Sequence, residues 1–355
     1  MIEKGTRYLY LENKIIKFKN MGIFERYLTI WVGLSIVVGV ALGRIFPFFF
    51  ELLSNLQYAN VNFIVAILIW VMIYPMMVGI DFSNIKEVAQ KPKVFGISFV
   101  ITWLIMPFSM AILGTIFLQH IFKDFIPEID AKEYLAGLIL LGGAPCTAMV
   151  FVWSKLVKGN ANYTLVQVSL NDIIMIFAYA PIVAFLLGVA KIEIPRDTLI
   201  LSIMLYVLIP MLGGYFTRKN LSTSKLENFL NHLKPHSMCG LLVTIILLFG
   251  FQADILIENP APILMVAMPI ILQSFLMFGL AYFWMYKAKI PHNISAPASL
   301  ISSSNFFELA VAVAIGLFGL NSGASFATVV GVLVEVPVML LLVNIANKTA
   351  KFFNF

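Results

Sequence analysis

Four side chains that could bind a solute or carry a proton lie inside long apolar stretches of this sequence. Cys146 follows a proline within the segment 142–147, and Asp172, Glu308 and Glu335 are each flanked by apolar residues. A thiolate is a soft ligand. Burial disfavours the charged form of an acid, so such an acid can exchange a proton or hold an ion. The combination predicts reversible binding of a soft solute coupled to movement of a proton or an ion.

The composition predicts that these groups lie inside a membrane protein. Of the 355 residues, 61% are apolar and only 12% are charged, whereas a soluble domain usually carries about 25% charged residues. So much apolar surface cannot be hidden in a water-soluble core, so lipid must be the solvent for much of it. The net charge of +6 forms no basic stripe, so we expect no nucleic-acid partner.

Ten apolar runs are long enough to cross a bilayer, which needs about 20 residues. They lie at roughly 27–47, 61–80, 94–120, 134–155, 162–190, 198–217, 237–257, 262–286, 293–318 and 324–346. The sequence therefore predicts an all-α integral membrane protein with ten transmembrane helices.

The basic residues predict the orientation of these spans. With the tail 1–26 inside, 19 of the 24 Lys and Arg fall in cytoplasmic segments, and the outside segments hold only Arg44, Lys123, Lys132, Lys191 and Arg196. Basic residues concentrate on the cytoplasmic side of membrane proteins. This distribution predicts both termini in the cytoplasm. The tail lacks the short apolar core and cleavage site of a signal peptide.

Two interruptions predict an internal symmetry. Ten spans divide into five-span halves, 27–190 and 191–355, which must have opposite orientations because five is an odd number. Helix-breaking residues interrupt the fourth span at 142–146 and the ninth at 302–305, and the span after each break carries one buried acid. The sequence therefore predicts two inverted five-helix repeats, an arrangement typical of secondary transporters.

The break in the fourth span has two interpretations. Two glycines and a proline interrupt helical hydrogen bonds, and such backbone is tolerated at membrane depth where it is buried in protein or lines a cavity. A proline kink without a ligand is the simpler interpretation. The second break favours a binding site, in which a half-helix starting near Thr147 would favour the thiolate of Cys146.

We predict two sets of functional residues from this pattern. The substrate-binding set is Pro145, Cys146, Thr147 and Asn305, and the proton-coupling set is Glu308, Asp172 and Glu335. Hydrogen-bonded helix contacts are the alternative role for the acids, although no Lys or Arg lies in a span core to pair with them. Cys239 has no comparable setting, and we expect it to pack as a small apolar residue.

Several of these stretches resemble one known family. Residues 143–154 (GAPCTAMVFVWS), 163–168 and the pair Asn171-Asp172 are similar to the Acr3 family of arsenite efflux permeases, as are 305–310 and 334–337. The similarity covers all ten predicted spans. The string Ala-Pro-Cys-Thr-Ala-Met-Val-Phe-Val-Trp is long and specific.

The resemblance implies the fold of the bile acid/sodium symporter superfamily, with spans 4 and 9 discontinuous and crossing near the membrane midplane. It implies export of arsenite, and in some members antimonite, in exchange for protons, which gives arsenic resistance. The family's essential cysteine matches Cys146, which would hold As(III) as substrate, and its essential glutamate matches Glu308. The expected location is the plasma membrane, here a bacterial inner membrane.

Other functions stay open at this point. A sodium-coupled organic anion symporter on the same fold would use Asn171, Asp172, Glu308 and 302–304 as oxygen ligands. We expect neither an enzyme nor a cofactor, because the sequence holds no phosphate-binding lysine loop, HExxH or GxSxG motif. A channel is disfavoured because broken helices suit alternating access. The sequence is compatible with both a monomer and a homodimer.

Overall fold

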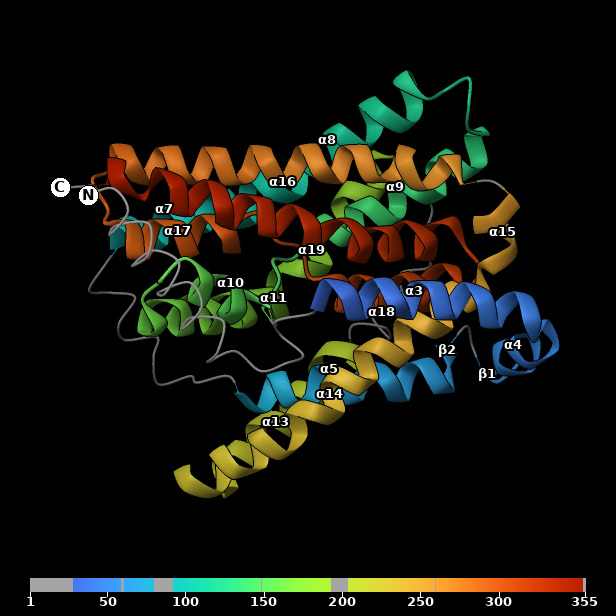
Figure 1. Cartoon of the computed structure of the whole chain (residues 1–355), viewed down its shortest axis with the longest axis horizontal. Helices are drawn as coiled ribbons and strands as arrows, with labels where there is room; N and C mark the ends of the chain where they lie inside the picture. The colour runs from blue at the N-terminus through green and yellow to red at the C-terminus, as the bar shows by residue number, and fades with distance from the viewer. Residues whose placement is uncertain are drawn as a thin grey trace, which may run out of the picture.

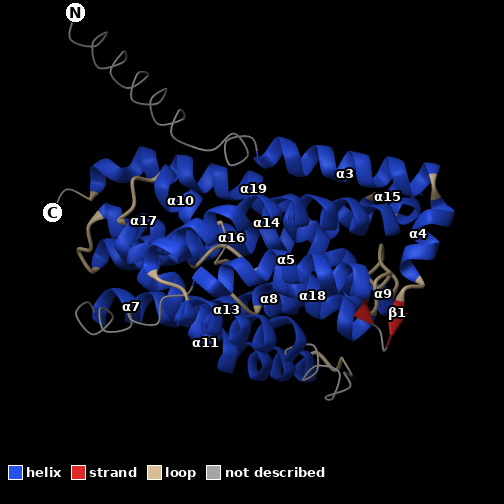
Figure 2. Cartoon of the chain, turned by 90° about the horizontal axis from the view of Figure 1, so that it is seen from below, coloured by secondary structure: helices blue, strands red, loops and turns tan. Residues whose placement is uncertain are grey.

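The computed structural model describes residues 28–58, 61–79, 92–147, 149–192, 204–258 and 260–353, and almost all of them are helical (Figure 2). The predicted tail 1–26 lies outside the described residues. The elements are, in chain order, α3 (Leu28–Ile45), α4 (Pro47–Ser54), β1 (Gln57–Tyr58), β2 (Val61–Asn62), α5 (Phe63–Gly79), α7 (Pro92–Phe99), η2 (Val100–Ile105), α8 (Met106–Thr115), η3 (Ile116–Ile121), α9 (Glu128–Gly142), α10 (Val150–Leu156), α11 (Ala161–Val189), η4 (Met204–Leu208), α13 (Ile209–Asn220), α14 (Thr223–Phe251), α15 (Ala253–Glu258), α16 (Ala261–Lys287), α17 (His292–Ile301), α18 (Phe307–Phe318), α19 (Gly323–Thr349) and η5 (Ala350–Phe352).

The described helices are those of a multi-pass membrane protein. Five stretches are long and apolar enough to cross a bilayer: Pro92–Ile121, Ala161–Val189, Asn228–Phe251, Ala261–Lys287 and Gly323–Phe352. A sixth crossing results if α3 and α4, which are bent by 99°, count as one span. Other predicted spans correspond to shorter helices, such as α5, or to pairs of half-helices, so the count of ten stays a prediction.

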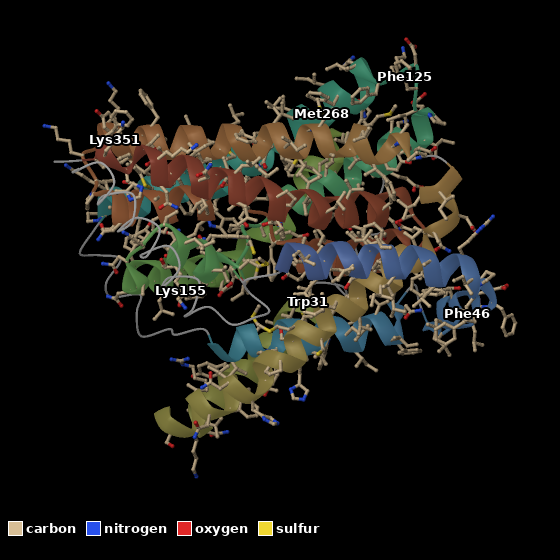
Figure 3. The ribbon with its side chains drawn as sticks, viewed as in Figure 1. Trp31, Phe46, Phe125, Lys155, Met268 and Lys351 are labelled. Carbon is tan, nitrogen blue, oxygen red and sulfur yellow. The ribbon has the colours of Figure 1, made fainter. Side chains whose placement is uncertain are left out.

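The outer surface is apolar over much of its extent, as a bilayer requires. Phe46, Phe125 and Met268 are 55%, 72% and 49% exposed. Figure 3 shows these side chains projecting from the helices, with Phe46 and Phe125 at one end of the molecule and Lys155 and Lys351 at the other. Acyl chains are a favourable environment for such a surface, whereas water is not.

Polar side chains fix where several helices begin. The side chain of Asn160 accepts a hydrogen bond from the Tyr163 N–H and so caps α11, and Ser322 caps α19 in the same way. These caps satisfy N–H groups that have no partner in the first turn of a helix. Glu133 on α9 also accepts a hydrogen bond from the Gly323 N–H, with 2.5 Å between the two atoms. This contact fixes α9 to the start of α19.

Two of the membrane helices are interrupted, as the sequence predicts. The helix α9 ends at Gly142 and α10 begins at Val150, while α17 ends at Ile301 and α18 begins at Phe307. Both predicted breaks are therefore confirmed. The second half-helix of the first break starts at Val150 rather than near Thr147, since Pro145 pairs with Asn305 in a β-bridge and neither Cys146 nor Thr147 is helical.

The helices pack as two groups, and each takes members from both sides of residue 190 (Figure 1). In the first, which we call the scaffold group, α14 packs along α3 and α5, and α13 packs along α5. The second, the broken-helix group, contains α8 to α11 and α16 to α19. The main contacts between the groups are made by α18 and α19, which touch α5 and α3.

Glycines let α3 and α14 approach closely in the scaffold group. A Cβ atom at Gly43 would lie 2.2 Å from the carbonyl oxygen of Gly250, and one at Gly39 would lie 2.6 Å from that of Ile246. Close packing and dispersion are the main attractions between helices in lipid, where the hydrophobic effect is weak. The scaffold group therefore depends on the absence of side chains at these positions.

We predict that Gly43→Ala destabilises the protein, because its Cβ would overlap the backbone of α14. Overpacking of this kind typically costs about 1–3 kcal/mol. Gly33→Ala is the matched control on the same helix, where nothing lies within 4 Å of the added atom. The measurement is thermal unfolding of the purified protein in detergent. Equal unfolding temperatures for the two variants would contradict the packing argument.

Candidate functional site

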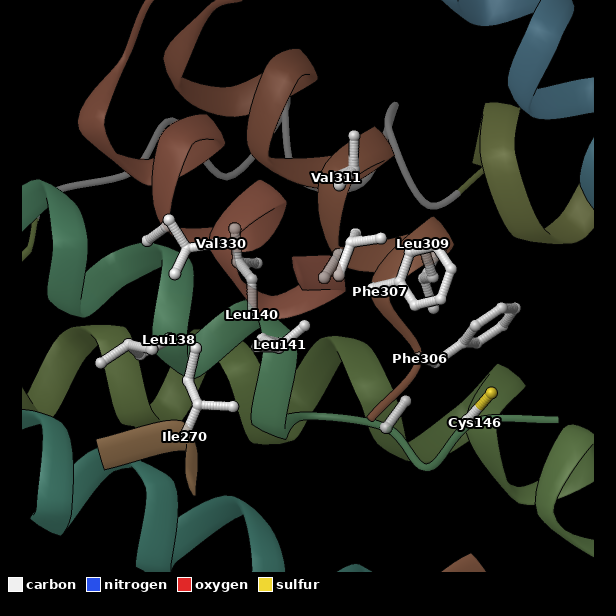
Figure 4. Close-up of a cluster of buried hydrophobic side chains, with 14 of the residues drawn as sticks. Leu138, Leu140, Leu141, Cys146, Ile270, Phe306, Phe307, Leu309, Val311 and Val330 are labelled. Carbon is white, nitrogen blue, oxygen red and sulfur yellow. The ribbon is translucent and has the colours of Figure 1, made fainter. Parts of the chain in front are cut away.

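The two breaks cross and hydrogen-bond to each other. The Cys146 N–H donates to the Ser304 carbonyl at 3.0 Å, and the Phe306 N–H donates to the Ala144 carbonyl at 2.9 Å. Figure 4 shows the two extended segments side by side, with Cys146 on one and Phe306 on the other. Each break thus supplies partners for the backbone groups that the other leaves without helical bonds, as a buried segment in a membrane requires.

The register of this contact explains why a proline fits in it. Pro145 and Asn305 face each other as an isolated antiparallel bridge. The two hydrogen bonds come from their neighbours, so the bridge is the type in which the facing residues do not bond to each other. Pro145 therefore loses nothing by lacking an N–H, and the N–H of Asn305 stays free to bind a side chain.

Cys146 lies fully buried at the centre of the crossing. Ser304, Glu308 and Glu335 are its buried polar neighbours. The structure thus brings together a residue of the predicted substrate set and two of the predicted proton-coupling set, although they lie on different spans.

Glu335 reaches the crossing from the middle of α19. The hydroxyl of Ser304 donates to one carboxylate oxygen in a short hydrogen bond, and the other oxygen, Oε2, has no hydrogen-bond partner among the described residues. Glu308 is its charged neighbour. The carboxyl group of Glu335 is therefore in direct contact with the second break.

Glu308 lies in the first turn of α18 and is buried. A negative charge is favourable at the N-terminal end of a helix. One of its oxygens, Oε2, has no hydrogen-bond partner among the described residues. That oxygen is available to a proton or a ligand.

Asp172 and Thr147 form the remaining part of the site. Asp172 is buried on α11, and Thr147 is its polar neighbour. Its neighbour Thr147 places Asp172 beside the first break, whereas Glu308 begins the helix after the second break and Glu335 bonds to Ser304 within it. Thr147 is also buried and follows Cys146 directly.

Unpaired polar atoms are concentrated in this region. Among the described residues, buried oxygens without a hydrogen-bond partner include one each on Thr147, Asp172, Asn305, Glu308 and Glu335. Leaving such a group unpaired typically costs about 1–3 kcal/mol. Their concentration at one crossing indicates a ligand-binding site. The described residues hold no group of three His, Cys, Asp or Glu side chains placed for a metal ion.

Sequence reasoning missed two polar residues around the crossing, Thr102 and Trp103, and named Ser304 only as part of the break and as an oxygen ligand in the sodium-coupled alternative. Ser304 bonds to Glu335, and Thr102 bonds to Ser302 with 2.9 Å between the hydroxyl oxygens. Trp103, next to Thr102, bonds to Asn171. Ser304 can be recognised as a candidate from its position within the break, whereas Thr102 and Trp103 lie in an ordinary apolar run.

Comparison with known proteins identifies the family to which the chain belongs. The model of the Sodium Bile acid symporter family matches residues 66–259, more than half of the chain. The chain is 53% identical over 347 residues to the arsenical-resistance protein Acr3 of Alkaliphilus metalliredigens, covering 96% of this chain and 97% of the relative. The chain belongs to the Acr3 family.

Two further relatives extend this result. An uncharacterized transporter of Synechocystis, slr0944, is 42% identical over 94% of this chain and 91% of its own length. The arsenical-resistance protein Acr3 of Corynebacterium glutamicum is 28% identical over 91% of this chain and 88% of its own length. The chain is therefore a membrane transporter of the Acr3 family, within the larger bile acid symporter family.

We predict that the crossing depends on the Phe306 N–H. Phe306→Pro removes this donor and leaves the Ala144 carbonyl unpaired, so the variant should unfold more easily than Phe306→Ala, by about 1–3 kcal/mol. Ala161→Pro, compared with wild type, is the control, because Ala161 is the first residue of α11 and follows the extended residue Asn160, a position where proline is well tolerated. The measurement is unfolding in detergent. An equal proline penalty at both positions would contradict the prediction.

Proposed function

We propose that this chain exports arsenite in exchange for protons and thereby confers arsenical resistance. The observation that carries the proposal is the buried crossing in which Cys146 bonds to Ser304, Ser304 bonds to Glu335, and Glu308 lies in the first turn of the helix that follows. The relatives that share the whole length of the chain include two named as arsenical-resistance proteins. Antimonite, a chemically similar trivalent oxide species, is a further proposed substrate.

The thiol of Cys146 suits arsenite chemically. Soft sulfur ligands favour thiophilic elements. At neutral pH arsenite is mainly the uncharged trihydroxide. The sulfur replaces one hydroxide on arsenic, and that hydroxide leaves with the thiol proton as water. Release is the reverse hydrolysis. A single thiol holds arsenic reversibly, whereas three would bind it too tightly to release it. Pro145, Thr147 and Asn305 complete the proposed substrate site.

The acids give the proposed coupling to protons. Glu308 has an unpaired oxygen within the crossing, and it carries the exchanged proton in this mechanism. Protonation from the outer side favours arsenite release and the return of the empty site, and loss of the proton to the cytoplasm completes the cycle. Asp172 and Glu335 are proposed to share this role, because both are buried beside the same breaks.

The proposed topology follows the sequence. Ten spans form two inverted repeats, 27–190 and 191–355, with both termini in the cytoplasm and the protein in the plasma membrane of a bacterium. In each half, a broken helix is followed by a long continuous helix, and this order supports the repeat. The broken helices are α9–α10, followed by α11, and α17–α18, followed by α19. Lys155 and Lys351, both predicted to be cytoplasmic, lie at the same end of the molecule (Figure 3).

A sodium-coupled organic anion symporter is the second candidate, and the description of the matching family model favours it. The unpaired oxygens of Asp172, Asn305 and Glu308 would then hold sodium, and Cys146 would be incidental. Purified protein in liposomes separates the two functions when pH and sodium gradients are varied independently, with As(III), Sb(III) and a bile-type anion as substrates.

We predict that Cys146→Ser abolishes arsenite accumulation in everted membrane vesicles, because a hydroxyl is a hard ligand and binds arsenic far more weakly than a thiol. Cys239→Ser is the matched control, since the described chain holds a second free cysteine there that is exposed. Accumulation by this control should stay within about twofold of wild type, as expected for a surface change. Undiminished arsenite resistance in cells that carry Cys146→Ser would refute the role of the thiol.

We predict that Glu308→Gln reduces arsenite accumulation driven by a pH gradient to the level of vesicles without the protein. Glutamine keeps the size and polarity of the side chain but cannot bind and release a proton. Glu51→Gln, on the exposed surface of α4, is the control and should behave as wild type. Steady accumulation by Glu308→Gln would show that another group carries the proton.

A further inference from the structure

A short π-helical turn carries two polar side chains to the crossing. The turn η2 interrupts the helix formed by α7 and α8, and within it Thr102 and Trp103 are both buried. Thr102 bonds to Ser302 at the second break, and the indole N–H of Trp103 donates to Oδ1 of Asn171 at 3.2 Å. Single π-turns inside α-helices are frequent at functional sites, because the extra residue redirects side chains.

The side-chain amide of Asn171 is held in one orientation. Its Oδ1 accepts the indole N–H of Trp103 and also a hydrogen bond from Nε2 of Gln167, each at 3.2 Å. Gln167 is oriented in turn, because its Oε1 accepts from the hydroxyl of Tyr163 at 3.2 Å. An indole can only donate, so the oxygen of Asn171 must face it. The NH2 group of Asn171 therefore faces away from both donors.

That NH2 group has no partner. The Nδ2 atom of Asn171 is buried and makes no hydrogen bond among the described residues. Asn171 precedes Asp172 on α11, and its partner Trp103 follows Thr102, which bonds to the second break. The unpaired donor thus belongs to a residue that bonds to the turn in contact with the second break and that precedes Asp172, the neighbour of Thr147 at the first break.

The polarity of this group distinguishes two kinds of ligand. An N–H carries a positive partial charge, so it binds the oxygen of an uncharged hydroxyl compound and repels a cation. Had the amide been reversed, its oxygen would have been a further ligand for sodium. Trp103 and Gln167 occupy that oxygen, so position 171 offers only a donor.

We propose that Trp103 and Gln167 are positioning residues that fix Asn171 as a hydrogen-bond donor to a hydroxyl of the substrate. The arrangement selects a small neutral polyhydroxy compound and excludes sodium from this part of the site. The inference rests on the proposed function, since arsenite is the substrate with such hydroxyls, and it assigns a source of specificity that Cys146 and the acids do not provide.

The test measures arsenite transport by purified variants in liposomes. Trp103→Phe keeps the aromatic bulk and removes one of the two donors to Asn171. We expect its KM for arsenite to rise about two- to tenfold, the range for loss of one hydrogen bond, with the maximal rate little changed. Trp153→Phe is the matched control, because Trp153 is equally buried and its indole nitrogen has no partner in the described structure.

A second variant tests the polarity itself. Asn171→Asp replaces the donor with an oxygen at nearly constant volume, so its KM for arsenite should rise and sodium should inhibit it when sodium chloride replaces choline chloride. Wild type should not respond to sodium. If wild-type protein transports no arsenite, the proposed function fails and this inference fails with it. If wild type is active but Trp103→Phe matches Trp153→Phe and Asn171→Asp ignores sodium, only the positioning role is overturned.

Discussion

The pairing of two interrupted helices is the constraint on which the rest of this structure depends. Backbone groups without partners are costly inside a bilayer, where water cannot replace a lost hydrogen bond. A single break in one span would leave several such groups. Two breaks that cross can satisfy each other, as the bonds from Cys146 to Ser304 and from Phe306 to Ala144 show. The irregular backbone of each break is therefore stabilised by hydrogen bonds to the irregular backbone of the other.

The register of the crossing also determines the chemistry around it. Because Pro145 and Asn305 face each other without bonding, the N–H groups of their neighbours make the bonds across the crossing, and Ser304, whose carbonyl accepts one of these bonds, also bonds to Glu335 through its hydroxyl. A shift by one residue would exchange bonded and non-bonded positions. The proline would then occupy a position that needs an N–H.

The local parts of this arrangement were predictable from the sequence, and the long-range parts were not. Glycine and proline at 142–145 and the polar run 302–305 indicate breaks through their own backbone preferences, and both breaks are confirmed. The buried acids stand out because charged residues are rare in apolar spans. The register between the breaks depends on residues about 160 positions apart, which no local pattern encodes. The π-turn at Val100–Ile105 contains no glycine or proline of its own, so no residue within it marks Thr102 or Trp103.

The position of α18 links the site to the packing of the whole protein. This helix starts with the residues of the second break, carries Glu308 in its first turn, and is also a principal contact between the broken-helix group and α5 of the scaffold group. Within the scaffold group, the glycine contacts of α3 and α14 leave little room for adjustment. A change of charge at Glu308 therefore acts at the start of a helix that packs against α5 of the scaffold group. In the proposed cycle, the same side chain can bind the proton and bias the contact that must change when the site opens to the other side.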